Sequence, residues 1–446
     1  MRIDFIKNIT VWNVFKVSMP LMISALSSHL MLILDQLVLA RYSIDAMTGA
    51  SAASIWCGAL QCAAMSITMI AGAFVGNYNG AKKFKLAGIP VWQMIWFSLS
   101  LFIISIPISM FAGEFCIPES LRSEGVPFFK ILMFAAPISG VYYSLASFFV
   151  AIGRGILVTI SAILANVVNV TIDIILVFGF FGIDGFQGSV GAAIGTVSAI
   201  IINTSFLLFC FFRKSIREKY KTLNFKLRIN KLKECLKLGA AGGVGHIFEM
   251  SAWSIVYYLL ATMGKEVAMI QSIAVSVNIF MAFIVSGLEK GVMAITANLL
   301  GAGVKDKIKI LLKKALIIHF IFTGIAAIIF LFFPEIIINN FIKFDVGSDV
   351  VQHAILVLRL VLLYFLFDGV VWVIAGVIEA GGDISYTMIT IATCLWIFVT
   401  IPSYILYKFG MLQVEFTWIM LFVAVVSISI ILYHRYKSDK WNHIKI

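Results

Sequence analysis

The sequence predicts an all-α integral membrane protein, in which twelve transmembrane helices form two six-helix bundles related by an internal repeat. Hydrophobic residues make up 61% of the 446 residues and charged residues 13%, whereas a soluble globular chain is roughly half apolar and about a quarter charged. Apolar runs long enough to cross a bilayer follow one another along the whole chain, and its two halves share short motifs in the same order. These three observations place the chain in a membrane.

A transmembrane helix needs about 20 consecutive, mostly apolar residues. Twelve segments meet this requirement, and polar loops separate them. Helical periodicity adds little here, because the lipid-facing and core-facing sides of such helices are both apolar. The predicted spans are residues 14–40, 50–78, 89–113, 128–151, 156–180, 189–212, 235–262, 267–300, 312–333, 352–379, 385–408 and 413–434.

Lysine and arginine are distributed unevenly between the loops. If the N-terminus is cytoplasmic, 26 of these residues lie on the cytoplasmic side and 6 on the other, while Lys290 and Arg359 fall within spans. Cytoplasmic loops of membrane proteins carry such an excess of positive charge. We therefore expect a multi-pass protein of the inner or plasma membrane with both termini in the cytoplasm. The net charge of +12 follows from this asymmetry, so we expect no nucleic-acid partner.

Two motifs recur about half a chain apart. NYNGA (77–81) ends the second span and NLLGA (298–302) ends the eighth, while AIGRG (151–155) follows the fourth span and EAGGD (379–383) follows the tenth. Matches in the same order indicate two parallel repeats, an architecture common among transporters. We expect an N-lobe at residues 1–212, a basic cytoplasmic linker at 213–234 and a C-lobe at 235–446.

Polar side chains within the first-half spans lie at a similar depth. Asp35 lies in the outer third of span 1, and Thr196 lies near the outer start of span 6. Asn166, Asn169 and Asp173 follow the spacing i, i+3, i+7 and share one face of span 5. Carboxylate, amide and hydroxyl oxygens suit Na⁺, and two carboxylates can also share a proton. We predict a cation site, a metal site if the ion is Na⁺, at Asp35, Asn169, Asp173 and Thr196.

The second half has its own embedded acids. Glu249 lies at the middle of span 7 and Asp368 at the middle of span 10, where charged side chains are costly and usually functional. Aromatic residues flank both acids at helical spacing, a pattern that suits a flat organic cation through charge pairing and ring faces. We predict a cation or substrate site at Glu249 and Asp368. The aromatic candidates for its lining are Trp253, Tyr257, Tyr364 and Trp372.

Three further ionisable residues are candidates for adjusting this site. His246 precedes Glu249 by three residues and can tune its carboxylate or relay a proton. Glu289 and Lys290 are neighbours in the cytoplasmic half of span 8. Lys290 can neutralise Glu249 or Asp368, or face the cytoplasmic mouth. Embedded acids outnumber embedded bases, so the interior should favour cations.

Some classes of activity find no support in the sequence. It contains no G-x-x-x-x-G-K-[ST] phosphate loop, and no Ser/His/Asp or Cys/His constellation stands out in the spans. We therefore expect neither an enzyme nor a bound cofactor. Active transport would draw on a gradient of Na⁺ or H⁺ as the coupling ion.

The motifs in order resemble those of the multidrug and toxic compound extrusion (MATE) family of secondary transporters. The resemblance covers nearly the whole chain. The matching features are Pro20 with Asp35, Gly80-Ala81, GRG at 153–155, Asn169-x-x-x-Asp173, GAAIGT at 191–196, Glu249, Asn298-x-x-Gly301-Ala302, Asp368, and GGD at 381–383 followed by Trp396 and Pro402.

This resemblance implies two six-helix lobes that form a V, alternating access, and export of organic cations coupled to Na⁺ or H⁺. It also implies a first-lobe cation site at Asp35, Asn169, Asp173 and Thr196. The second-lobe acids Glu249 and Asp368 favour the NorM-type branch over the DinF-type branch. The departures from the family pattern are Ala40-Arg41, Glu379 and the pair Glu289-Lys290.

Two other readings remain at this stage. A flippase for lipid-linked precursors has a related fold. However, pyrophosphate headgroups require Arg or Lys in the cavity, and the excess of embedded acids argues against binding of such headgroups. An ion channel would present repeated rings of ligands, whereas these acids lie in separate halves. We therefore expect a monomeric antiporter whose partners are organic cations and membrane lipid.

Overall fold

The structure is a computed structural model that describes residues 8–182, 185–341 and 348–444. Within these ranges the chain is almost entirely helical and contains no β-strand. Four of the basic residues counted for the orientation lie outside the described residues, namely Arg2, Lys7, Lys343 and Lys445.

Nine α-helices of the described chain precede the linker, and they supply the first six predicted spans. Two of these spans are pairs of consecutive helices, α3 with α4 and α5 with α6. The helices are α2 (Val11–Tyr42), α3 (Ile44–Thr68), α4 (Ile70–Gly80), α5 (Gly88–Ser100), α6 (Phe102–Phe111), α7 (Gly113–Cys116), α8 (Arg122–Ala151), α9 (Gly155–Val177) and α10 (Ser189–Phe212).

The short helix α11 (Lys214–Tyr220) lies in the predicted linker, and α12 begins at Ile229, ahead of the predicted start of the seventh span. A π-helical turn at Trp396–Thr400 joins α17 to α18 within the eleventh span. The second-half helices are α12 (Ile229–Ala261), α13 (Lys265–Gly301), α14 (Lys307–Phe332), α15 (Pro334–Phe341), α16 (Ser348–Ala380), α17 (Ile384–Leu395), α18 (Ile401–Lys408) and α19 (Val414–Lys437).

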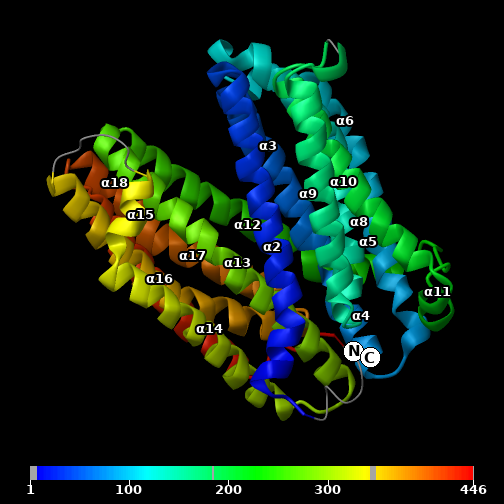
Figure 1. Cartoon of the computed structure of the whole chain (residues 1–446). Coiled ribbons are helices and arrows are strands. Elements are labelled where there is room, and N and C mark those ends of the chain that lie inside the picture. Colours follow the sequence, from blue (N-terminus) through cyan, green and yellow to red (C-terminus); the bar gives the residue numbers. More distant parts are fainter. Residues whose placement is uncertain (1–7, 183–184, 342–347, 445–446) are drawn as a thin grey trace.

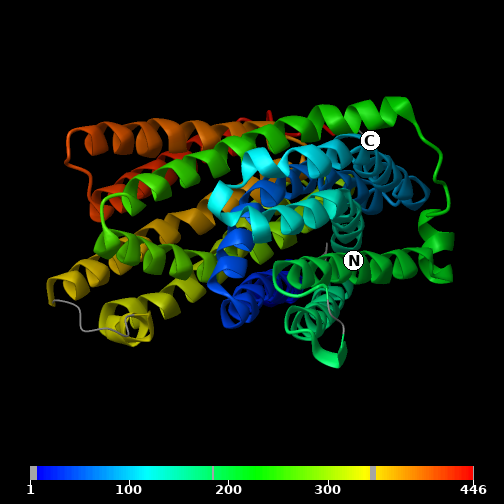
Figure 2. The ribbon, with the colours of Figure 1, turned by 90° about the horizontal axis from the view of Figure 1, so that it is seen from above.

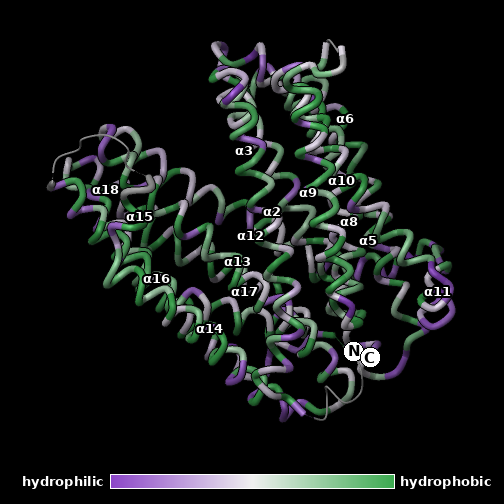
Figure 3. The backbone as a smooth tube through the Cα atoms, in the orientation of Figure 1, coloured by the Kyte–Doolittle hydropathy of each residue, from purple (hydrophilic) through white to green (hydrophobic). Residues whose placement is uncertain are grey.

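Eleven helical segments of the described chain are long and apolar enough to cross a membrane. The predicted seventh span, α12, is not among these eleven segments, because it starts with a charged turn and continues through glycines, His246 and Glu249, which lower its hydropathy. It packs against α17 of its own bundle and against α3 of the other. Figure 3 shows apolar residues along the helix middles, with hydrophilic residues gathered at α11 and at several helix ends.

The two bundles form a V (Figure 1). They meet at the end where the chain termini lie and diverge at the other end. Viewed from above, the yellow-to-red helices of the second bundle gather on one side of the molecule (Figure 2). The predicted two-bundle, V-shaped, all-α fold is confirmed.

The repeated motifs meet each other at the closed end of the V. A Cβ atom added at Gly80 would lie 2.0 Å from the carbonyl oxygen of Asn298, and one added at Gly301 would lie 1.9 Å from that of Asn77. Each glycine therefore allows the end of one helix to touch the end of its counterpart. The two motifs identified as a repeat form one reciprocal contact between α4 and α13.

Asparagine side chains reinforce this contact. Asn79 donates to Asn298 Oδ1 (2.7 Å), and Asn77 donates to the carbonyl of Ala380 (3.2 Å). Tyr220 of α11 in turn donates to Asn79 Oδ1 (3.0 Å). Burial raises the pKa of Tyr220 to about 12, so its hydroxyl remains a donor at neutral pH. Buried amides with satisfied partners fix one arrangement of the lobes at this end.

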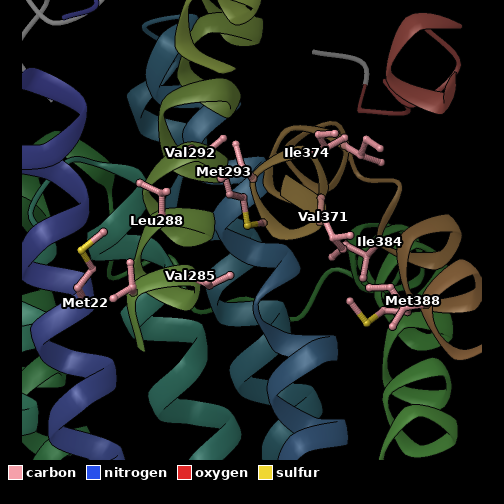
Figure 4. Close-up of a cluster of buried hydrophobic side chains, with 14 of the residues drawn as sticks. Met22, Val285, Leu288, Val292, Met293, Val371, Ile374, Ile384 and Met388 are labelled. Atoms are coloured by element: carbon pink, nitrogen blue, oxygen red, sulfur yellow. The ribbon is translucent and has the colours of Figure 1, made fainter. Parts of the chain in front are cut away.

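A second interlobe contact lies further along α13, where Gly287 and Gly291 face α2. A Cβ atom at Gly287 would lie 2.4 Å from the backbone nitrogen of Met22, and one at Gly291 would lie 2.1 Å from Ser18 Oγ. Small residues four apart let two helix backbones approach closely in a membrane. Figure 4 shows Met22 of α2 beside Val285 and Leu288 of α13.

Candidate functional sites

The structure brings together the four side chains predicted for the first-lobe cation site. Asn169 donates to Asp173 Oδ2 (3.1 Å) within α9, and Thr196 of α10 donates to Asp35 Oδ2 of α2 (3.3 Å). The Asp35 and Asp173 carboxyl groups lie within side-chain hydrogen-bonding reach of each other. The consecutive helices α9 and α10 and the distant helix α2 thus contribute to one polar cluster.

The cluster has more acceptors than donors. Asp35 Oδ1, Asn169 Oδ1 and Asp173 Oδ1 are buried and have no hydrogen-bond partner in the described structure. Two carboxyl groups that face each other repel when both are ionised, unless a proton or a cation lies between them. Buried oxygens without a donor are costly. The oxygens in this cluster are suited to hold either a proton or a small hard cation such as Na⁺.

Gly195 makes room for this arrangement. A Cβ atom at this position would lie 1.8 Å from Asp173 Oδ1, a separation that no packed side chain permits. The GAAIGT motif therefore contributes a glycine as well as Thr196. The sequence had indicated a role in the cation site for Thr196 only.

Asn166 shares the predicted face of α9 but serves another purpose. Its amide donates to the backbone oxygen of Ser27 (2.6 Å) and to the Ser27 hydroxyl (2.8 Å). It therefore fixes α9 against α2 and holds Asp173 opposite Asp35.

The second-lobe acids have donors of their own. Asp368 Oδ1 accepts hydrogen bonds from Tyr364 and from the indole of Trp372, both at 3.1 Å. His246 Nδ1 lies 3.2 Å from Glu249 Oε2. The predicted proximity of His246 to the Glu249 carboxylate is present in the structure.

Glu249 and Asp368 border one small cavity together with Trp253, Tyr364 and Trp372. Its volume is about 20 Å³, which is room for a water molecule or a small ion but far less than an organic cation needs. Tyr257 does not line this cavity. It is half-exposed, and its hydroxyl lies 3.3 Å from Ser272 Oγ.

A larger cavity lies between the lobes. It has a volume of about 370 Å³, and an adjoining space of about 240 Å³ shares six of its lining residues. The walls come from helices of both bundles and include five methionines. These are Met65, Met69, Met250, Met293 and Met388.

Charged side chains at one side of this interlobe cavity come from α12, α13 and α16. Glu289, Lys290 and Asp368 line it together with His246 and Glu379. Lys290 faces the cavity and lies near Glu289. Glu379, noted in the sequence only as a departure from the family pattern, is 6% exposed, and its Oε1 atom has no hydrogen-bond partner.

The fold and these embedded carboxylates define a membrane transporter rather than an enzyme. The model of the MatE family matches residues 20–175 and 244–405, one segment in each lobe. The chain belongs to this family, the multidrug and toxic compound extrusion transporters, as the sequence motifs predicted.

Curated relatives of similar sequence carry multidrug names. A probable multidrug resistance protein NorM of Pseudomonas putida is 23% identical, with 87% of this chain and 86% of the relative covered. The multidrug export protein MepA of Staphylococcus haemolyticus is 22% identical, with 70% and 68% covered. The probable multidrug resistance protein YoeA of Bacillus subtilis is 21% identical, with 83% and 81% covered. NorM proteins among these relatives agree with the predicted branch.

Solved structures agree on the fold. A MATE protein in the straight conformation gives a TM-score of 0.85 at 16% identity, with 100% of both chains covered. A transporter of the MOP superfamily from Pyrococcus furiosus gives 0.84 at 16% identity, with 100% of this chain and 99% of that chain covered.

Proposed function

We propose that this protein is an antiporter that exports organic cations across the cell membrane in exchange for Na⁺ or H⁺. The observation that carries the proposal is the pair of carboxyl groups at Asp35 and Asp173, which face each other with unpartnered buried oxygens. Such a pair requires a cation or a proton between its members. In this proposal, the coupling ion is the cation or proton that lies between the two carboxyl groups.

Coupling follows from competition for negative charge. When the ion binds from outside, it neutralises the carboxylates and weakens the attraction for an organic cation in the interlobe cavity. The organic cation then leaves, and the ion-loaded protein returns to face the cytoplasm. Each ligand shifts the balance between the two orientations by its difference in affinity for them.

The small cavity at Glu249 and Asp368 fits the same scheme as a second ion site. Its volume of about 20 Å³ suits an ion or water. We assign both termini to the cytoplasm on the distribution of Lys and Arg. The V then opens to the outside, and the contact at Gly80 and Gly301 closes the cytoplasmic end.

The test uses the purified full chain in proteoliposomes with ethidium as the transported cation. A Na⁺ gradient at fixed pH and a pH gradient without Na⁺ are imposed separately. We expect one gradient to drive ethidium transport, and Asp35→Asn to abolish that response. Equal transport by Asp35→Asn and the original chain would contradict the proposal.

The same vesicles discriminate the flippase. Gradient-independent movement of a fluorescent lipid pyrophosphate, without ethidium transport, would replace the antiporter by a flippase. The acids of the interlobe cavity argue against that outcome, because they repel a pyrophosphate headgroup.

A further inference from the structure

We propose that Glu379, supported by Glu289, binds the positively charged group of the exported compound in the interlobe cavity. This inference rests on the proposed function and adds a substrate site to it. The site is separate from the carboxyl pair at Asp35 and Asp173, and it adjoins the small cavity at Glu249, with which it shares Asp368 and Trp372.

The position of Glu379 follows from a close approach of two helices. A Cβ atom at Gly376 would lie 2.7 Å from the backbone oxygen of Glu289, so α16 and α13 touch at this level. Glu379 follows Gly376 by three residues and therefore lies on the same side of α16, one turn nearer the helix end. From there its side chain reaches the wall of the interlobe cavity, which Glu289 also lines.

One oxygen of the buried Glu379 carboxyl group has no hydrogen-bond donor. The Oε1 atom of Glu379 is buried and has no hydrogen-bond partner, and the residue as a whole is only 6% exposed. Glu289 of α13 and His246 of α12 line the same cavity and interact electrostatically with its carboxyl group. A buried carboxylate in this position requires a positive charge or a donor from within the cavity.

The charge balance of the surrounding groups points the same way. Glu289 interacts with Lys290, His246 and Glu249, so the neighbouring cations are already shared among other acids. Four carboxylic side chains border the interlobe cavity or the small cavity beside it, against one lysine, Lys290, and two histidines, His29 and His246. These acids are Glu249, Glu289, Asp368 and Glu379. An additional cation would reduce the remaining imbalance.

The walls of the cavity suit a bulky apolar cation. Methionine side chains are flexible and polarisable, so they adapt to ligands of different shape. The volume of about 370 Å³, with about 240 Å³ adjoining, lies in the range of pockets for drug-sized compounds. Figure 4 shows Met293 extending from α13 into the space beside Val371 of α16. The chemical class is thus a large organic cation with one charged centre.

The experiment measures equilibrium binding of tetraphenylphosphonium to the purified full chain at fixed pH, with no gradient. This probe is permanently charged, so its charge does not depend on pH. We expect Glu379→Gln to weaken binding at least tenfold and Glu379→Asp to weaken it less. Glu335→Gln, an exposed carboxylate on α15, is the matched control and should bind as the original chain does. Thermal unfolding and gel-filtration profiles verify that each variant is folded.

The outcomes separate this inference from the proposed function. If Glu379→Gln binds tetraphenylphosphonium as tightly as the original chain, the inference is overturned while ion-driven export is unaffected. If the original chain does not bind the probe, the inference is also overturned, and gradient-driven ethidium transport still tests the antiporter. If Glu379→Gln weakens binding but no gradient drives transport, the substrate site stands and the antiport mechanism fails.

Discussion

The two lobes carry embedded acids in opposite surroundings. In the first lobe, Asp35 and Asp173 face each other and leave oxygens without partners. In the second lobe, Asp368 accepts two hydrogen bonds from aromatic side chains, and Glu249 has His246 beside it. The related folds of the lobes thus hold two different kinds of site. The first leaves buried oxygens that suit a proton or a small cation, whereas the carboxylates of the second have donors beside them.

The largest difference between the lobes should appear when one carboxylate of the first pair is removed. Asp173→Asn leaves one acid and removes the reason for a shared cation, so we expect ion-driven ethidium transport to fall at least 100-fold. Asp45→Asn, at an exposed carboxylate near the start of α3, is the control and should transport normally. Gradient-driven flux in proteoliposomes measures both. Full activity in Asp173→Asn would indicate that the coupling ion binds in the second lobe instead.

A second change tests the geometry of the first site without altering charge. In Gly195→Ala the new methyl group would overlap Asp173 Oδ1 and displace the carboxylate from Asp35. We expect the half-saturating concentration of the coupling ion to rise about tenfold or more, which corresponds to about 1.4 kcal/mol. Gly58→Ala, where an added Cβ meets nothing within 4 Å, should leave it unchanged. An unchanged ion dependence in Gly195→Ala would mean that the carboxyl contact is not needed.

The second lobe should tolerate the loss of one donor better. Tyr364→Phe removes one of the two hydrogen bonds to Asp368 and leaves the Trp372 bond in place. One such bond to a charged group contributes about 1.5–3 kcal/mol, and the remaining donor reduces the loss. We expect a three- to tenfold change in ion dependence of transport. The control is Tyr404→Phe, at a half-exposed tyrosine on α18. An effect of equal size in this control would contradict a specific role for the Tyr364 hydroxyl.

The smallest effect on transport should come from the scaffold behind the second site. Trp418 donates to Gln271 (3.0 Å) in the buried interior, and its ring packs edge-on against Tyr364. Gln271→Leu leaves the indole donor unsatisfied, so we expect a loss of about 1–3 kcal/mol of stability with nearly normal transport. Thermal unfolding in detergent measures this loss. The exposed Gln413→Leu is the control, and equal melting temperatures for both variants would contradict the expectation.

The sequence predicted the fold well because the bilayer imposes one length and one composition on every span. The loop charges supported the succession of the spans, and the shared motifs indicated the repeat. Part of the first-lobe polar cluster could also be predicted, since Asn169 and Asp173 share a helix face. Asp35 and Thr196 come from other helices, and their contact with Asp173 followed only from the family resemblance and a similar depth.

Other parts of the sites lay beyond sequence reasoning for physical reasons. Tyr257 was expected beside Glu249, but it follows Glu249 by eight residues, so its side chain points roughly 80° away from that of Glu249 around the helix axis. Glu379 stands at a helix end in the sequence, where an acid is ordinarily solvated, and only the packing of α13 against α16 buries it. The role of Gly195 is steric and depends on a side chain of a neighbouring helix. Cavity volumes depend on all the packed side chains at once.

The reciprocal glycine contact at the closed end has a mechanical consequence. Gly80 and Gly301 bring two helix ends to touching distance, and Gly287 and Gly291 bring α13 against α2 nearby, so a rotation of the lobes that keeps these contacts has its pivot near the closed end of the V. From Gly301 the 37-residue helix α13 extends for about 55 Å, and a rotation of about 10° at the pivot moves its far end by roughly 10 Å. The pivot lies at one end of a long lever, so a tilt too small to disturb packing inside either lobe displaces the opposite rim by about the width of a helix.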